Sequence, residues 1–319
     1  MRLAWPPWRR SSSRWVGLTT EAGEITLALV GRQTAKGREL LAADVEGGEF
    51  TETTLAPLIE RNQAAGASCV LTLEPGAYSL FQVERPQVGP DELRAAVRWK
   101  IKDLVDYSLD DAVLDVFDVP PRSQGQDSGS VYVAVASAEQ LRPRVEAINE
   151  AGLALQRIDI AELSLRNIAA SIADPEEAVA LIHLGRHRGM VAIARGQTLY
   201  LARALGYGFD TLGGGAAVAE DGMDFADADP GFEAIALELQ RTADYYDSYF
   251  GQAPVRKIRI VPGLPSLEPL ASHLGSNLAL DADLVPFESL GMLAPDFDAA
   301  AMAPGVLALG GVLAAEGSS

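Results

Sequence analysis

Apolar residues recur along the chain in short runs, and these runs form two sets with the same order. The first set predicts three strands within residues 15–44, a helix from Thr51 and a buried strand at 69–73. The second set predicts strands at 178–184, 189–194 and 197–205, a helix at 231–251, and then a strand and a helix at 257–263 and 264–275. The repeated order predicts two related α/β lobes that face each other across a cleft.

A different segment separates the two sets and runs from residue 77 to residue 158. Its pattern is strand, helix, strand, strand, helix, strand, and its first helix starts near Pro90, a residue favoured in the first helical turn. We therefore expect an inserted small βαββαβ subdomain within a two-lobed α/β fold. The expected parts are a tail at 1–14, the first lobe at 15–76, the inserted subdomain at 77–158, and the second lobe with a closing helix at 159–319.

The composition narrows the function classes. The 319 residues carry a net charge of −18, which argues against a nucleic-acid partner, because contacts with phosphate backbones need Lys and Arg. The single cysteine, Cys69, excludes an internal disulfide and stands in an apolar run typical of a core. Three histidines argue against a zinc site. No apolar run approaches the roughly 20 residues of a membrane span.

Residues 1–14 stand apart from this acidic composition, because they hold four arginines, Trp5, Trp8 and no acidic residue. Two interpretations stay open. The segment is either a basic tail without a structural role, or it makes a weak contact with an anionic membrane surface, where Trp and Arg are favoured. Pro6 and Pro7 argue against a regular amphipathic helix. In both cases we expect the segment to be dispensable for folding.

The sequence of residues 84–119, ERPQVGPDELRAAVRWKIKDLVDYSLDDAVLDVFDV, resembles the matching segment of the PilM-type pilus-assembly proteins. Within that family it is most similar to the MshI type of mannose-sensitive haemagglutinin pilus systems. Similar stretches follow at 149–168, 238–251 and 303–314, the last with the sequence APGVLALGGVLA. The resemblance implies an actin-like fold related to the division protein FtsA. It also implies a cytoplasmic scaffold of type IV pilus biogenesis, peripheral at the inner membrane through a PilN-like partner.

PilM-type proteins usually bind ATP, and the resemblance also implies where the nucleotide loops lie. Here Glu21 and Glu24 replace glycine and the hydroxyl-rich turn of the first loop, and carboxylates repel a polyphosphate. His183 replaces the acid that would organise Mg²⁺ or water. We therefore expect a degenerate cleft, no resident cofactor (neither ATP nor Mg²⁺) and no enzymatic activity. The candidate cleft residues are Gly17, Thr19, Thr20, Gly185, Arg186, Arg188, Gly206, Gly208 and Gly263.

The basic turn formed by Arg186, His187 and Arg188 leaves two interpretations open. Its side chains could bind an anion in place of the lost loop. Alternatively, the turn is exposed, or it pairs with Glu21 and Glu24 and so closes the cleft without a ligand.

Three functions are to be distinguished for a chain with these features. The first is a scaffold with a degenerate cleft, and the second is an ATP-binding, actin-like assembly ATPase. The third, a sugar-kinase-like enzyme, is disfavoured because it needs an aspartate where His183 stands. In relatives the partner's tail lies between the inserted subdomain and the first lobe, and other pilus-assembly proteins are further expected partners. The candidate docking residues are Tyr78, Phe81, Val83 and Arg85.

Overall fold

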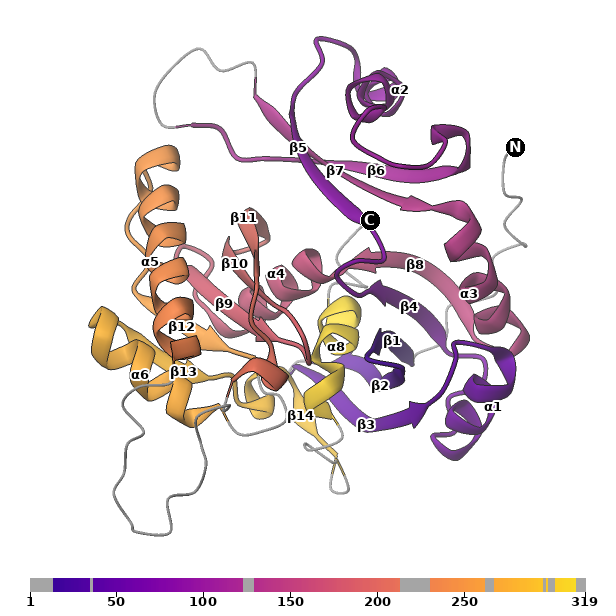
Figure 1. The fold of residues 1–319 in the computed structure, drawn as a ribbon. Coiled ribbons are helices and arrows are strands. Elements are labelled where there is room, and N and C mark those ends of the chain that lie inside the picture. Colours follow the sequence, from indigo (N-terminus) through magenta and orange to yellow (C-terminus); the bar gives the residue numbers. More distant parts are fainter. Residues whose placement is uncertain are drawn as a thin grey trace.

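The computed structural model describes residues 14–34, 37–122, 129–212, 230–261, 267–294, 297 and 302–313. Each of two lobes contains one β-sheet, and a third, smaller sheet lies at the top of the view in Figure 1. Within these ranges, no helix combines the length and the apolar character that crossing a membrane requires.

The first lobe is built on a six-stranded sheet with the order β14-β3-β2-β1-β4-β8. β1, β2 and β3 form an antiparallel meander, whereas β4 lies parallel to β1 and β8 lies parallel to β4. Helices α1 and α3 pack on this sheet through Leu55, Leu58 and Ile148. The bounds are β1 (Trp15–Glu21), β2 (Glu24–Thr34), β3 (Gly37–Gly47), α1 (Glu52–Arg61), β4 (Ser68–Leu73), α3 (Ala138–Glu150), β8 (Ala154–Ile160), η4 (Phe287–Ser289) and β14 (Met292–Leu293).

The second lobe repeats this plan in a five-stranded sheet with the order β11-β10-β9-β12-β13. Here β9, β10 and β11 form the meander, β12 lies parallel to β9, and β13 lies parallel to β12. The predicted duplication is therefore confirmed at the level of strand order and direction. The bounds are β9 (Ala178–Leu184), β10 (Gly189–Arg195), β11 (Thr198–Leu205), η2 (Phe209–Thr211), α5 (Pro230–Phe250), β12 (Lys257–Ile260), α6 (Glu268–Leu278) and β13 (Asp281–Leu284).

Two helices, α4 (Ala161–Ile172) and α8 (Val306–Leu313), fill the space between the lobes, and η5 (Ala303–Gly305) leads into α8. α8 is almost entirely apolar and buried, so its free carbonyl groups need partners within the protein. Ser164 and Asn167 of α4 donate hydrogen bonds to the carbonyls of Leu307 (2.7 Å) and Gly310 (2.9 Å). These contacts fix α8, and with it the lobe junction, to α4.

The inserted part contains a three-stranded sheet with the order β5-β7-β6 and one helix, α2. Its elements are β5 (Ser79–Glu84), α2 (Pro90–Ile101), η1 (Leu109–Asp111), β6 (Ala112–Asp118) and β7 (Ser130–Ser137). The remaining helix and strand of the expected βαββαβ unit, α3 and β8, pack in the first lobe. The insertion is therefore a βαββ unit over 79–137, narrower than the expected 77–158.

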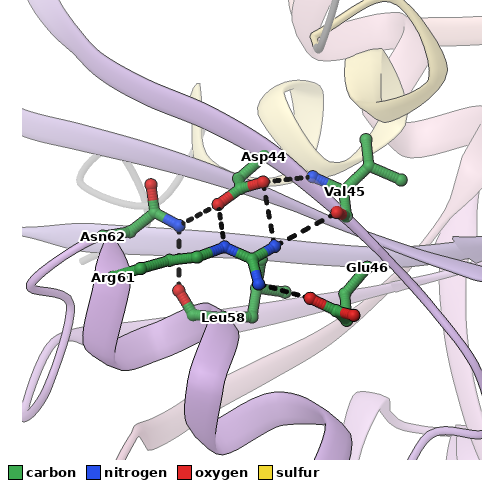
Figure 2. A network of polar contacts seen from close by, with 6 residues as sticks. All are labelled: Asp44, Val45, Glu46, Leu58, Arg61 and Asn62. Atoms are coloured by element: carbon green, nitrogen blue, oxygen red, sulfur yellow. Dashed lines mark hydrogen bonds and ion pairs between the residues drawn. The ribbon is translucent and has the colours of Figure 1, made fainter.

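A polar network ties α1 to the edge of β3 (Figure 2). The Arg61 guanidinium donates from Nε to Asp44 Oδ2 at 2.5 Å and from Nη2 to Asp44 Oδ1 at 3.0 Å, and it also pairs with Glu46. Asn62 Nδ2 donates to the same Asp44 carboxylate at 2.6 Å. Burial alone would raise the pKa of Asp44, but the hydrogen bonds from Arg61 and Asn62 outweigh it and hold that pKa below its ordinary value.

Candidate functional site

A cavity of about 390 Å³ lies where the turns of the two lobes meet. The β1–β2 turn forms one side, the end of β9 and the following hairpin form the other, and η2 and η5 complete the wall. This is the position that the sequence analysis assigned to the nucleotide cleft. The lining residues are Glu21, Ala22, Glu24, Thr26, His183, Leu184, Arg186, Phe209, Asp210, Ala303 and Pro304.

The β1–β2 turn has only two central residues, Ala22 and Gly23, and both have positive φ angles, of 52° and 83°. This is the geometry of a tight hairpin turn. Such a turn ends β1 abruptly and places the Glu21 side chain at the mouth of the cleft.

The Glu21 carboxylate reaches across the cleft and contacts the second lobe. Its Oε1 accepts a hydrogen bond from the backbone N–H of Arg186, with an N···O distance of 2.7 Å. Gly185 makes this contact feasible, because a Cβ atom at that position would lie 2.0 Å from the same Oε1. An anionic group of the first lobe therefore occupies the backbone donor of the second-lobe turn.

The second-lobe turn is held rigidly by its own backbone and by η2. The N–H of Gly185 bonds to the carbonyl of Arg188, and the N–H groups of Phe209 and Asp210 bond to the carbonyls of Gly185 and Arg186, all at 2.9 Å. A Cβ on Gly208 would lie 2.5 Å from the Arg188 backbone nitrogen. The glycines here serve close packing between the turn and η2.

Burial shifts the pKa values of two side chains that line the cleft. Burial raises the pKa of Glu21, and the hydrogen bond from the Arg186 backbone offsets part of that rise. His183 lies buried at the end of β9, and burial lowers its pKa to about 4, so the imidazole is neutral near pH 7. A neutral imidazole cannot replace a carboxylate in organising Mg²⁺, which prefers oxygen ligands.

The structure brings together only some of the predicted cleft residues. Arg186 lines the cavity, and Gly185, Arg188 and Gly208 build the turn beside it. Gly206 stands at the end of β11, where a Cβ atom would meet nothing within 4 Å. Gly263 lies outside the described residues.

Gly17, Thr19 and Thr20 are strand residues of β1 and do not line the cavity. A Cβ on Gly17 would lie 2.0 Å from the Ala308 carbonyl oxygen, so this glycine lets α8 approach β1. The buried Thr19 and Thr20 hydroxyls have no hydrogen-bond partner among the described residues.

Sequence reasoning did not assign the wall formed by Phe209, Ala303 and Pro304 to the site. Phe209 follows two of the predicted cleft glycines, and Ala303 and Pro304 begin a stretch that resembles the pilus family, yet nothing in their spacing indicates that they share a cavity with Glu21. Only the return of the chain through η5 brings them together.

The candidate docking residues lie where the inserted part leaves the first lobe. The Tyr78 hydroxyl donates to the buried carboxylate of Glu162 on α4, and Arg85 forms an ion pair with Asp118 of β6. Phe81 and Val83 are half-buried against the core beneath α2. Their side chains are thus partly committed to the protein's own packing.

The backbone of β5 is less committed, because β5 is an edge strand of the small sheet. It pairs with β7 on one side only among the described elements. Gln82 and Glu84 of β5 are exposed. An edge strand offers free N–H and C=O groups to an extended peptide.

Comparison with known proteins agrees with this architecture. Residues 85–230, just under half of the chain, match the family model of the type IV pilus assembly protein PilM. A chain of the solved PilM–PilN type IV pilus biogenesis complex matches 95% of this chain over 98% of its own length, with 18% identity and a TM-score of 0.69. No curated protein sequence matches significantly.

Two further solved structures share the fold. One is the cytoplasmic domain of EpsL, an inner-membrane component of the type II secretion system of Vibrio cholerae, with 14% identity, 96% of each chain covered and a TM-score of 0.52. The other is a Bacteroides thetaiotaomicron protein described as having an actin-like ATPase fold, with 7% identity, 90% of this chain and 95% of that chain covered, and a TM-score of 0.50. The fold is actin-like. The expectation drawn from the sequence resemblance is confirmed at this level.

Proposed function

We propose that this actin-like protein is a scaffold of type IV pilus biogenesis that binds the cytoplasmic tail of a PilN-like inner-membrane protein. The observation that carries the proposal is the match of residues 85–230 to the PilM family model, together with a PilM–PilN structure that covers almost the whole chain. On the resemblance of residues 84–119 we assign it to the MshI type. In this role the protein is cytoplasmic and is held at the inner membrane by its partner.

The free edge of β5 supports a docking site for an extended tail. Strand addition would use backbone hydrogen bonds, with a few apolar anchors for specificity. Tyr78 stands at the start of this edge and links it to α4 through Glu162. A tail that becomes ordered on binding loses conformational entropy, so a few anchors must supply much of its affinity.

We further propose that the nucleotide cleft of this scaffold is degenerate, and the contact between Glu21 and Arg186 supports this. It joins the facing turns of the two lobes through a side chain of the protein itself. The alternative function, an ATP-binding assembly ATPase, is favoured by the actin-like ATPase fold of one structural relative and by a cavity at the expected place. Affinity for Mg-ATP separates the two functions.

Docking can be tested with a fluorescent PilN-like N-terminal peptide and two labelled positions. The two single-cysteine variants are Gln82→Cys on β5 and Val113→Cys on β6, both at exposed positions. Because the native Cys69 is buried, a thiol-reactive photo-crosslinker should label only the introduced cysteine. We expect the peptide to crosslink from position 82 and not from the control position 113. Backbone N-methylation of the peptide should abolish binding if strand addition holds it.

The possible failures of this experiment are distinguishable. Absence of peptide binding to the intact protein would refute the scaffold function. Binding with equal crosslinking from both positions would keep the scaffold function but remove β5 as the docking site.

A further inference from the structure

The helix of the inserted part, α2, has one face that no other described element covers. Its inner face packs Val97 and Ile101 against the small sheet. On its outer face, Trp99 is 78% exposed, the highest value among the large hydrophobic residues of the described chain. Figure 1 shows α2 on the side of the small sheet away from the two lobes. A single exposed apolar residue needs no explanation, but a tryptophan this exposed is typical of an interaction site.

The residues around Trp99 form an ordered stripe along the outer face. Glu92, Ala95 and Trp99 of α2 are followed by Lys102, the C-cap residue with helical backbone angles. The spacings are three and four, so the four residues share one side of the helix. All four are exposed. The Lys102 ammonium lies 5.9 Å from the centre of the Trp99 ring. The stripe therefore has an acidic end, a small residue beside a large one, and a basic end.

We propose that this stripe is an interface with a second copy of the same chain, in which the two α2 helices pack antiparallel about a twofold axis. An axis midway between residues 92 and 102 is also midway between residues 95 and 99. It therefore places Glu92 opposite Lys102 of the second copy, and Trp99 over Ala95 of the second copy. Each contact occurs twice, as a twofold interface requires.

The pattern of charges favours a second copy as the occupant. The chain as a whole carries a net charge of −18, which an anionic bilayer repels, whereas α2 itself has mixed charges, with Asp91 and Glu92 in its first turn and Arg98 and Lys100 in its last. The stripe is instead complementary to itself. α2 has 12 residues, about 18 Å of helix, so one helix pair buries less than the roughly 1,200 Å² of a standard interface. The dimer is therefore weak and reversible.

Sedimentation of the full chain between about 1 µM and about 1 mM covers the range in which weak interfaces associate. We expect concentration-dependent dimers, and Trp99→Ala should weaken them at least ~10-fold. Leu237→Ala, at a 46% exposed position on α5, is the matched control for non-specific apolar association and should leave the dimer unchanged.

Charge-reversal variants at the two ends of the stripe give the decisive experiment. Lys102→Glu makes both ends of the stripe acidic and Glu92→Lys makes both ends basic, so each variant alone should dimerise about 3- to 10-fold more weakly. An equimolar mixture should restore association as a heterodimer, and the double variant Glu92→Lys/Lys102→Glu should restore the homodimer.

Three results would overturn the proposal. In the first, the chain stays monomeric over the whole concentration range. In the second, the mixture of the two charge-reversal variants associates as weakly as each variant alone. In the third, the protein binds anionic vesicles in a way that depends on Trp99 and does not self-associate. The docking of a PilN-like tail at β5 is tested separately, so neither result decides the other.

Discussion

The Glu21 carboxylate accepts the backbone N–H of Arg186 at 2.7 Å, although the two residues are 165 positions apart and belong to different lobes. A hydrogen bond to a charged group contributes about 1.5–3 kcal/mol. The contact therefore stabilises the arrangement in which the two turns face each other, and any anion that needs the same N–H must displace the Glu21 carboxylate.

The intact protein should bind Mg-ATP with a dissociation constant no tighter than about 1 mM, or about −4 kcal/mol. Glu21→Ala removes a negative charge and frees the Arg186 N–H, so we expect pyrophosphate and Mg-ATP to bind at least about ten-fold more tightly. Calorimetry measures both. Glu24→Gln is the matched control, since it removes a cavity charge without touching Arg186, and its effect should be smaller. Micromolar binding by the intact protein would favour the ATPase function instead.

Gly185→Ala should destabilise the fold through Glu21. The new Cβ would lie 2.0 Å from Glu21 Oε1 and would displace the carboxylate, at a cost of about 1–3 kcal/mol. In a Glu21→Ala background the same substitution should cost less than half as much. A double-mutant cycle from urea unfolding measures this coupling. Additive costs would show that the carboxylate does not occupy the position beside Gly185.

His183 should make stability depend on pH. Its pKa is lowered to about 4 by burial, from an ordinary value near 6.5, so between these values the unfolded chain binds more protons than the folded protein. Stability should therefore rise with pH across this window, by up to about 3 kcal/mol. His183→Gln, which is neutral at every pH, should flatten that part of the curve in unfolding experiments. An unchanged slope would mean that His183 is not the group that titrates.

The duplicated lobes were predictable because each meander and each amphipathic helix has a local period. The boundary of the insertion was not. β8 is a short strand of mixed apolar and polar residues that nothing in its own sequence separates from the insertion, and only its parallel pairing with β4 assigns it to the first lobe. Periodicity reports which face of an element is buried, but it does not report which sheet the element joins.

The cleft shows the same limit. The residue types of the basic turn are compatible both with anion binding and with pairing to Glu21 and Glu24. In the structure, Glu21 bonds to the Arg186 backbone rather than to a cationic side chain, and His187 pairs with Asp210 at 3.1 Å. Side-chain types predict charge attraction, whereas a backbone donor is present at every residue and leaves no signal in the sequence.

The network of Figure 2 should contribute measurably to the first lobe. Arg61→Met keeps much of the side-chain length but removes the paired bonds to Asp44 and the contact with Glu46, so we expect a loss of about 1–2 kcal/mol in unfolding free energy. Asp44→Asn should cost a similar amount near pH 7.

Because the pKa of Asp44 is lowered in the fold, its contribution should be lost as the pH falls below about 4. Denaturation at about pH 7 and about pH 3 measures this. The difference in unfolding free energy between the unchanged protein and Asp44→Asn should be smaller at the lower pH. A constant difference would leave packing, rather than charge, as the cause.

Gly17 offers a test of how the lobes are joined. Its missing side chain lets α8 approach β1, and a Cβ atom would lie 2.0 Å from the Ala308 carbonyl oxygen and 2.6 Å from its carbon. Both are backbone atoms of a buried helix fixed by Ser164, so the strain cannot be relieved by a rotamer change. Gly17→Ala should therefore destabilise the protein by about 3 kcal/mol, at the upper end of the usual cost of overpacking.

Gly47→Ala is the matched control at the end of β3, since a Cβ there meets nothing within 4 Å. It should change stability by less than about 0.5 kcal/mol. If Gly17→Ala left both stability and Mg-ATP affinity unchanged, the close packing of α8 on β1 would be refuted. If it altered only ligand affinity, the expectation that Gly17 belongs to the nucleotide cleft would be restored.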